Sequence, residues 1–412
     1  MEYTYASLGK WPKKTFTMPS GWQFACDYKS HEISMKSTGV PLTGESAGRQ
    51  IWYKKRDDKG TYFNSPSSPR SRAKSPFKEE LTFCAADNPN SSDKIFRNLM
   101  ISQWQGEVPD EDFTPKTARD AAAKGLGFYQ MLQCEDGHWA GDYGGPMFLM
   151  PGLIIAMYVC KIPIAPERRE GMVQYLLNHQ QVDGGWGTHI ECASTMFGTV
   201  LSYVSLRLLG ESEKSPQVVK ALEFIHFYGG ALYAPSWAKF WLAALGVYDW
   251  KGVNPIPSEM WLLPKWFPFH PGNLWCHCRM VYLPMGYVYC SRFTPDVSKD
   301  TLLQSLRKEL YLENYDTINF DLYRQKCADI DEYSPLNPFM KVAQDICCLY
   351  ELILPHVPLL QNLRKQAQAF ALEYIYAEDL QTNSIDIGPV NKALNMLSVY
   401  IGGTKHPPDK WL

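Results

Sequence analysis

Two stretches decide the fold: KGLGFYQMLQCEDGHW at residues 124–139 and EGMVQYLLNHQQVDGGW at residues 170–186. Each has an aromatic residue on a helix-patterned segment, a Gln four or five residues later, and an acidic-glycine turn that ends in Trp. A weaker copy lacks the Gln. The repeated positions are Gln133 with Trp139, Gln180 with Trp186, and Trp237 alone. The tryptophans are 47 and 51 residues apart, about the length of a helical hairpin, so the sequence predicts stacked hairpins.

The repeat has a physical reading that needs no catalytic role. Glycines at 137, 184 and 185 allow the positive-φ backbone that ends a helix sharply. The Gln amide can bond backbone groups left unpaired at helix ends, and the indole can lie over it. We therefore predict a structural role for Gln133, Trp139, Gln180 and Trp186.

Helix signals are regular from Thr114 onward. Thr114 is a plausible N-cap with Pro115 at the first helical position. In residues 194–210 the apolar positions Phe197, Val200, Leu201, Val204 and Leu208 follow helical spacing, and Gly210 stands where a helix stops. Further helices are predicted at about 217–228, 339–353 and 361–377. Strand alternation is nearly absent, so the predicted class is all-α.

The predicted architecture has three parts. Residues 1–114 form an N-terminal region whose Ser-, Pro- and Arg-rich insert at 64–76 has the composition of a disordered segment. Residues 115–340 form an α/α barrel (toroid) of helical hairpins. Residues 341–412 supply the opening helices of a second α/α barrel.

Charge and composition exclude several classes. The 41 Lys and Arg residues against 43 Asp and Glu give a net charge of −2, which argues against a general nucleic-acid binder. The sequence contains 13 Trp, 24 Tyr and 19 Phe, an aromatic content beyond ordinary core packing. Eleven cysteines without a leading apolar signal segment are interpreted as reduced thiols. No transmembrane helix is predicted, and attachment to one membrane face stays open.

Sequence motifs beside the repeat resemble those of a known enzyme family. GHWAGDYGGPMFLMPG at 137–152, DGGWGTHIECASTMFG at 183–198, PSWAKFWLAALGVYDWKG at 235–252 and PSEMWLLPKWFPFHPGNLWCHCRMVYLPMGYVY at 257–289 resemble the eukaryotic oxidosqualene cyclases, the lanosterol and cycloartenol synthases. The resemblance runs from about Ser91 to Tyr400. Together these motifs identify the family more specifically than the repeat does. Protein prenyltransferase subunits partly share the repeat.

The resemblance implies an isomerase that cyclises (S)-2,3-epoxysqualene to a triterpene alcohol. Such chemistry needs an acid, a dry cavity and aromatic faces that stabilise carbocations. It implies cavity positions, an access constriction, and no cofactor. The cavity positions are Tyr129, Trp237, His277 and Tyr400, the last standing where the family commonly has Trp, and the constriction positions are Cys278 and Tyr282.

Plainer interpretations of these residues stay open. By pattern alone Tyr129 packs on its helix's core stripe, and Trp237 is as readily structural. His277 could join His270 in binding zinc, but no second pair stands at ligand spacing, so no metal is predicted. The prenyltransferase alternative would need such a zinc set. A buried, hydrogen-bonded histidine is the ordinary alternative.

One family feature is absent from the 412 residues. The family protonates its epoxide with the Asp of an Asp-Cys-Thr-Ala-Glu motif, and bacterial relatives use Asp-x-Asp-Asp-Thr; neither string occurs here. Acids in the repeat turns are expected to cap helix N-termini or to face water, and none is nominated as the proton donor. These acids are Asp136, Asp142, Asp183 and Glu191.

Three interpretations follow: a truncated cyclase, a half-enzyme completed by a second chain that supplies the missing barrel, or a single-barrel module that binds lipid or a partner. The resemblance also implies an oxidosqualene-like lipid substrate and a monotopic protein on the cytosolic face of the endoplasmic reticulum or on lipid droplets. Residues 261–275, WLLPKWFPFHPGNLW, suit a lipid-facing plateau, or a buried loop between helices. The sequence does not specify the triterpene product.

Overall fold

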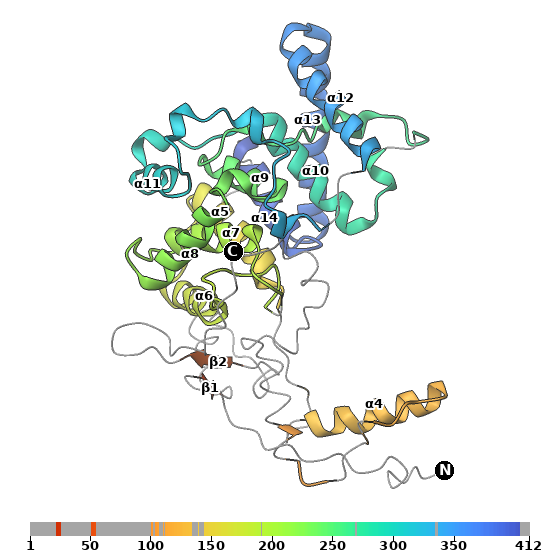
Figure 1. Ribbon diagram of the computed structural model, residues 1–412. Coiled ribbons are helices and arrows are strands. Elements are labelled where there is room, and N and C mark those ends of the chain that lie inside the picture. The colour runs from red at the N-terminus through yellow and green to blue at the C-terminus, as the bar shows by residue number, and fades with distance from the viewer. Residues whose placement is uncertain are drawn as a thin grey trace. The chain divides into compact units, whose positions relative to one another are not determined.

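The computed structural model describes residues 22–25, 51–54, 100–101, 104–106, 110, 112–133, 139, 144–190, 192–267, 270–333 and 337–403. Helices dominate these residues (Figure 1), which confirms the all-α class and agrees with the toroid expected of it. A short antiparallel pair, β1 (Trp22–Ala25) and β2 (Ile51–Lys54), was not predicted. With four residues in each strand, it does not alter the class.

Helices of two kinds follow the strands along the chain. The α-helices are α4 (Ala118–Leu132), α5 (Pro146–Val159), α6 (Pro166–His179), α7 (Met196–Leu208), α8 (Pro216–Phe227), α9 (Ser236–Leu245), α10 (Cys276–Ser291), α11 (Thr301–Glu309), α12 (Pro338–Ile353), α13 (Pro358–Gln381) and α14 (Pro389–Gly402). The 3-10 turns are η3 (Ala231–Tyr233), η4 (Trp250–Gly252), η5 (Ser258–Leu262), η6 (Pro271–Asn273), η7 (Val297–Lys299), η8 (Tyr315–Thr317), η9 (Phe320–Tyr323), η10 (Asp329–Asp331) and η11 (Leu354–His356). The predicted helices at about 217–228, 339–353 and 361–377 are confirmed as α8, α12 and α13.

The chain divides into two compact units. Of the described residues, those up to 144 and those at 170–179 belong to the first unit, and those at 145–169 and from 180 onward belong to the second. Helix α4 belongs to the first unit, whereas α5 and α7 to α14 belong to the second.

The start of α4 corrects one prediction. Its N-cap is Thr117, not Thr114. The Thr117 hydroxyl accepts a hydrogen bond from the Asp120 backbone N–H at 3.2 Å, and the Asp120 carboxylate accepts one from the Thr117 backbone N–H at 3.1 Å. This capping box satisfies two backbone donors at once, so it outweighs the preference of Pro115 for a first helical position.

Helix α7 is confirmed, but it is buried on all sides from Met196 to Arg207 and does not have a single buried stripe. Phe197, Val200, Leu201 and Val204 are all buried. Gly210 has φ +96°, and its N–H donates to the Arg207 carbonyl just past the helix end. Glycine adopts this left-handed conformation without the Cβ clash that other residues meet, which is why the helix can stop there.

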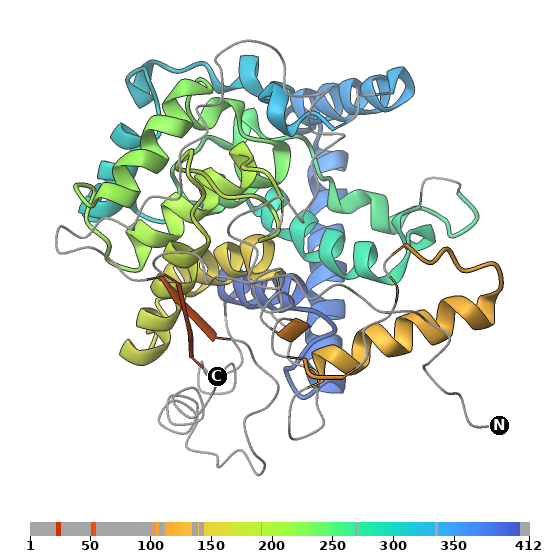
Figure 2. The ribbon, with the colours of Figure 1, turned by 60° about the horizontal axis from the view of Figure 1, so that its bottom comes forward.

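Helix α5 is central to the packing of the second unit. It packs against α7, α9 and α14, while α14 also packs against α10 (Figure 2). Gly152 permits the close approach of α5 to α9, because a Cβ at this position would lie 2.7 Å from Trp241 Cζ2. The close approach brings aromatic side chains of α5 and α9 within reach of each other.

Helices α12 and α13 are joined by a sharp bend at η11. No described helix is by itself long and apolar enough to cross a membrane, but residues 340–356 and 358–381, bent by 110°, reach that length and apolarity when taken together.

Candidate functional site

Four aromatic rings from four helices of the second unit form a continuous row, here called the aromatic row. Phe148 of α5 lies nearly parallel to Phe197 of α7, with ring centroids 5.2 Å apart. Phe148 also contacts Trp237 of α9 at 5.7 Å. Tyr282 of α10 meets Trp237 edge-to-face at 6.0 Å. The structure therefore brings together Trp237 and Tyr282, two residues that the sequence singled out for different roles.

The aromatic row is not fully enclosed by protein. Phe197 is buried, whereas Phe148, Trp237 and Tyr282 are half-buried. Ring surface that is free of protein contact can face a ligand, and its electron-rich face attracts cations by about 0.5–2 kcal/mol. The row can stabilise positive charge without supplying a nucleophile.

The position of Phe197 depends on a carboxylate from a distant segment. The two oxygens of Asp331 in η10 accept hydrogen bonds from the backbone N–H groups of Met196 at 2.6 Å and Phe197 at 2.8 Å. These are unpaired donors at the first turn of α7, where negative charge is favoured. Asp331 therefore fixes the start of α7 and with it the backbone of Phe197.

The start of α10 carries the other predicted residues of this region. His277 is exposed, and its ring lies 4.8 Å from that of Trp275. Cys276 Sγ lies 3.2 Å from His277 Nδ1. Cys278 is half-buried, one helical turn before Tyr282. In the described ranges, no three His, Cys, Asp or Glu side chains converge as metal ligands.

Two further predicted cavity residues belong to helices other than those of the aromatic row. Tyr129 is on α4 in the first unit, with 57% of its surface exposed. Tyr400 of α14 is half-buried and packs edge-to-face on Phe293 at 6.1 Å. The cavity roles of both residues stay predictions.

The Gln and Trp of the second repeat tie backbone segments together. The Gln180 amide donates to the carbonyls of Gly184 and Gln217, both at 2.8 Å. Trp186 is fully buried. Gly184 has φ +89°, and a Cβ there would lie 2.6 Å from the Lys220 carbonyl oxygen. Gly185 does not share this conformation, and Gly137 lies outside the described residues.

The first repeat makes a related contact within its own unit. Gln133 is the C-cap of α4, and the Trp139 indole donates to the Tyr129 carbonyl at 2.8 Å. The indole therefore satisfies a carbonyl in the last turn of the helix. Trp139 is 49% exposed, so its contribution to the core is smaller than that of Trp186.

Asp183 closes its own loop turn and does not cap a helix. Its Oδ1 accepts from the Gly185 N–H at 3.0 Å and from the Ser194 hydroxyl at 2.7 Å. Asp136, Asp142 and Glu191 lie outside the described residues.

Sequence reasoning missed a buried acidic pair between α13 and α14. Asp386 is fully buried, and Lys392 Nζ lies 3.3 Å from it and 3.8 Å from Asp379. Burial, together with a hydrogen bond and charge repulsion from Asp386, raises the pKa of Asp379 to about 7. The neighbouring Asn391 amide donates to the Met280 carbonyl of α10 at 3.0 Å. A carboxyl with this pKa can hold a proton near neutral pH.

Comparison with known proteins places these features in a family. Residues 125–408 match the family model described as the squalene-hopene cyclase N-terminal domain. The chain belongs to this family. Among relatives of the chain, mouse lanosterol synthase is 48% identical over 282 residues, which are 68% of the chain and 38% of the relative. The Dictyostelium discoideum cycloartenol synthase is 46% identical over 293 residues, 71% of the chain and 41% of that protein.

A third relative has a different product in its name. The alpha-onocerin synthase of Lycopodium clavatum is 42% identical over 320 residues, 76% of the chain and 40% of the relative. The chain thus spans about two-fifths of the length of the relatives it matches. The aromatic row, at residues 148–282, lies inside the segment that matches the family model.

Proposed function

We propose that this chain forms part of the cavity of a triterpene cyclase that acts on 2,3-oxidosqualene. The aromatic row carries the proposal. Its half-buried rings suit a reaction that moves positive charge along an apolar substrate, because π faces attract a cation without forming a bond to it. The relatives named as lanosterol, cycloartenol and alpha-onocerin synthases support this reaction class.

Within this proposal the residues take distinct roles. Trp237 and Phe148 present ring faces to cationic intermediates. Tyr282 and Cys278, on one side of α10, line the access constriction. His277, Tyr129 and Tyr400 keep the cavity roles that the family resemblance implies. The proposal assigns no proton donor among the 412 residues.

Binding of a cation mimic tests the aromatic row without requiring turnover. The probe is a squalene-like tertiary amine added to detergent-solubilised chain, with affinity measured by calorimetry. Trp237→Leu should weaken binding about 3- to 30-fold, since a desolvated cation–π contact contributes about 0.5–2 kcal/mol. Trp237→Phe should retain most of the affinity, and Trp139→Leu, in the exposed position of the first repeat, should change nothing.

Product formation is measured in parallel. The same chain is incubated with 2,3-oxidosqualene and the extract is searched for cyclised alcohols. Equal binding by the wild type and Trp237→Leu would contradict the proposed role of the row. Cyclised product from the chain would direct attention to acids such as Asp379 as donors.

We further propose that the chain contacts a lipid surface through residues 261–275 and α12. Trp266 is 81% exposed and Trp275 is 66% exposed in the first segment. On α12, four apolar side chains at helical spacing are exposed, and they are called the α12 stripe: Val342, Ile346, Leu349 and Ile353. Exposed aromatic and aliphatic groups of this kind suit the boundary between lipid head groups and acyl chains.

Vesicle binding tests the lipid contact. Co-sedimentation with phosphatidylcholine vesicles should fall at least fivefold for Trp266→Ser, because a large apolar ring leaves the interface. Phe227→Ser is the matched control: Phe227 is 65% exposed on α8, outside both segments. Equal losses for the two variants would contradict the proposal. We propose the endoplasmic reticulum or lipid droplets as the cellular membrane surface of this contact.

The α12 stripe could instead receive a second protein chain. Size-exclusion chromatography in detergent, together with vesicle binding, separates the two occupants. A lipid-facing stripe predicts a monodisperse chain in detergent that binds vesicles, whereas a protein-facing stripe predicts an oligomer that persists in detergent and does not bind vesicles.

A further inference from the structure

Helix α12 exposes apolar residues beside two charged ones, Lys341 and Asp345, and turns the charged Glu351 inward. Its exposed side carries the apolar α12 stripe, while Gln344, Cys347 and Glu351 on the opposite side are half-buried. Soluble proteins normally turn the polar side of a surface helix to water. Something must therefore hold Glu351 inward.

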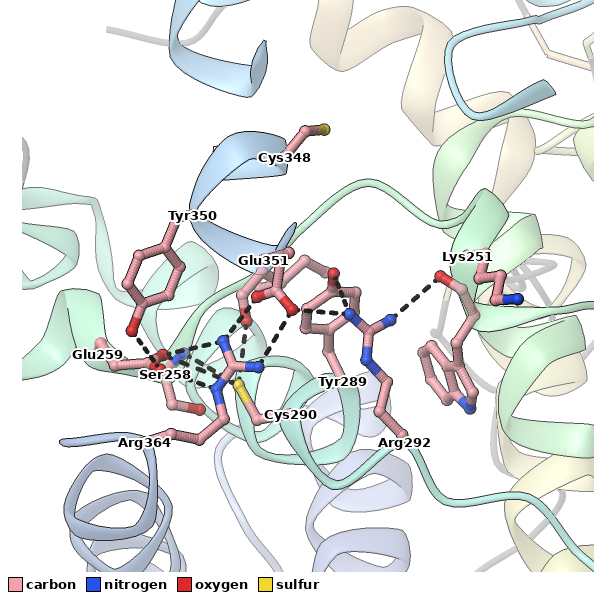
Figure 3. Close-up of polar contacts among 12 residues, drawn as sticks. Lys251, Ser258, Glu259, Tyr289, Cys290, Arg292, Cys348, Tyr350, Glu351 and Arg364 are labelled. Carbon is pink, nitrogen blue, oxygen red and sulfur yellow. Dashed lines mark hydrogen bonds and ion pairs between the residues drawn. The ribbon is translucent and has the colours of Figure 1, made fainter. Parts of the chain in front are cut away.

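Arg364 of α13 provides that hold, as Figure 3 shows. Its Nε donates to Glu259 Oε1 at 2.7 Å, and its Nη2 donates to Glu351 Oε1 at 2.6 Å. Arg292, the C-cap residue of α10, donates to the other oxygen of Glu351 at 2.8 Å. The Tyr350 hydroxyl donates to Glu259 Oε1 at 2.8 Å. Two consecutive residues of α12, Tyr350 and Glu351, are thus bonded on its inner side.

The network is buried and balanced in charge. The side chains of Arg364, Glu259 and Glu351 are 10%, 8% and 13% exposed. Burial by itself would raise the pKa of Glu351, but the two arginines outweigh it and leave that pKa below its usual value. Buried ion networks often add little net stability compared with apolar packing, and their best-attested use is to specify one arrangement.

The geometry of the network specifies the roll of α12 about its own axis. Residues two positions apart lie roughly 200° apart around an α-helix. Leu349 and Ile353 each stand two positions from Glu351, so holding Glu351 inward turns both outward. Glu259 lies on η5, directly before the segment 261–275. Arg364 therefore connects the two segments that the proposed lipid contact uses.

We propose that Arg364 is a positioning residue that fixes the roll of α12 and thereby presents the α12 stripe to lipid together with residues 261–275. This inference rests on the proposed lipid contact. It adds that the contact depends on a buried ion network rather than on exposed apolar residues alone.

A second buried network supplies a matched control. Arg207 binds Glu309 at 3.0 Å, the Tyr203 hydroxyl donates to the same glutamate, and the side chains of Arg207 and Glu309 are 9% and 11% exposed. This trio of arginine, glutamate and tyrosine links α7 to α11, and α12 contributes no residue to it. Arg207→Gln should perturb stability much as Arg364→Gln does, without altering the roll of α12.

The roll is first measured in water through Cys347. This thiol is half-buried on the inner side of α12, so its alkylation rate, read by peptide mapping, reports rotation or detachment of the helix. Arg364→Gln should raise the rate about tenfold, while Arg207→Gln leaves it unchanged. Arg364→Lys should give an intermediate alkylation rate. Its single ammonium group keeps the charge but lacks the planar set of donors with which the guanidinium group binds Glu259 and Glu351 together. If Arg364→Gln does not fold, Glu351→Gln, which keeps the Arg364–Glu259 pair, should show the same increase.

Contact of α12 with lipid is measured by photolabelling, with phosphatidylcholine vesicles that contain a diazirine-bearing phosphatidylcholine. After illumination, wild type and Arg207→Gln should carry label on Ile346 and Leu349. Arg364→Gln should lose at least four-fifths of that label or shift it to the inner side of the helix.

Each outcome has one meaning. No label on the stripe of the wild type would overturn the lipid contact itself, and the Cys347 rates would then still show whether Arg364 fixes the roll. Label on the stripe of the wild type with an unchanged pattern in Arg364→Gln would overturn the positioning role. The same conclusion follows if Cys347 is alkylated equally fast in wild type and Arg364→Gln.

Discussion

Two tryptophans in equivalent places of the repeat have different environments. Trp186 is fully buried, whereas Trp139 is about half exposed and bonded through its indole N–H to the Tyr129 carbonyl. The sequence motif is the same, but the surroundings of each tryptophan decide how much it contributes to stability. A shared pattern therefore predicts a shared position and not a shared contribution to stability.

Substitution by alanine should separate the two residues. Trp186→Ala should lower the free energy of unfolding by about 3–5 kcal/mol, because it leaves a large cavity in the core. Trp139→Ala should lower it by less than about 1 kcal/mol, as expected for an exposed side chain. Urea denaturation followed by circular dichroism measures both values. Similar losses would show that the first repeat is as tightly packed as the second.

The buried acidic pair predicts a pH dependence of stability. The folded-state pKa of Asp379 is raised to about 7 from an ordinary value of 3.8, so between these values the folded protein binds more protons than the unfolded chain. Its contribution is therefore fully present below about pH 4 and is lost as the pH rises through 7. Melting temperature against pH should fall less steeply over this range in Asp379→Asn than in the wild type. An identical slope in the two proteins would contradict the shifted pKa.

At the scale of the element, α7 is the helix that depends most visibly on a distant group. Asp331→Ala removes two charge-assisted hydrogen bonds from its first turn and leaves the N–H groups of Met196 and Phe197 without that partner. We expect a loss of about 1–3 kcal/mol in the free energy of unfolding. Asp120→Ala, in the exposed cap of α4, should lose only about 0.5–1 kcal/mol. Equal losses in the free energy of unfolding for the two variants would indicate that water replaces the hydrogen bonds of Asp331 to α7.

The contrast between α7 and the aromatic row shows what sequence can predict. The apolar positions of α7 follow from helical spacing alone. Trp237 and Tyr282 were found because they lie in sequence motifs that resemble the family. Phe148 and Phe197 were missed because each lies in an apolar helix, where a phenylalanine reads as core. Their proximity depends on the packing of α5 against α7, which is a tertiary contact.

The ion network was missed for a related reason. Glu259 and Arg364 are 105 residues apart, and no local pattern couples them. The segment 339–353 was correctly predicted as a helix, but periodicity shows only that one side is apolar. Which side faces outward is decided by Glu351 and its partners from other elements. Local spacing therefore gives the elements, while long-range polar contacts give their orientation.

At the scale of the whole molecule, the chain combines cyclase-family helices with apolar surface on the outside. The family match covers residues 125–408, and both the aromatic row and the α12 stripe fall within it. The row is an inner feature formed by four packed helices, whereas the stripe belongs to one helix on which Glu351 is held inward. The two features can therefore be altered independently.

The exposed stripe predicts how the molecule behaves in water. We expect the purified chain to associate in aqueous buffer and to become monodisperse when detergent covers the stripe, since contiguous exposed apolar surface drives association. Ile346→Ser with Leu349→Ser should shift the elution toward the monomer with little change in melting temperature, because both side chains are exposed. Leu322→Ser, at a position 68% exposed on η9, is the control and should leave the elution unchanged. A double variant that associates as strongly as the wild type would show that another surface drives association and would remove this support for the stripe as a contact site.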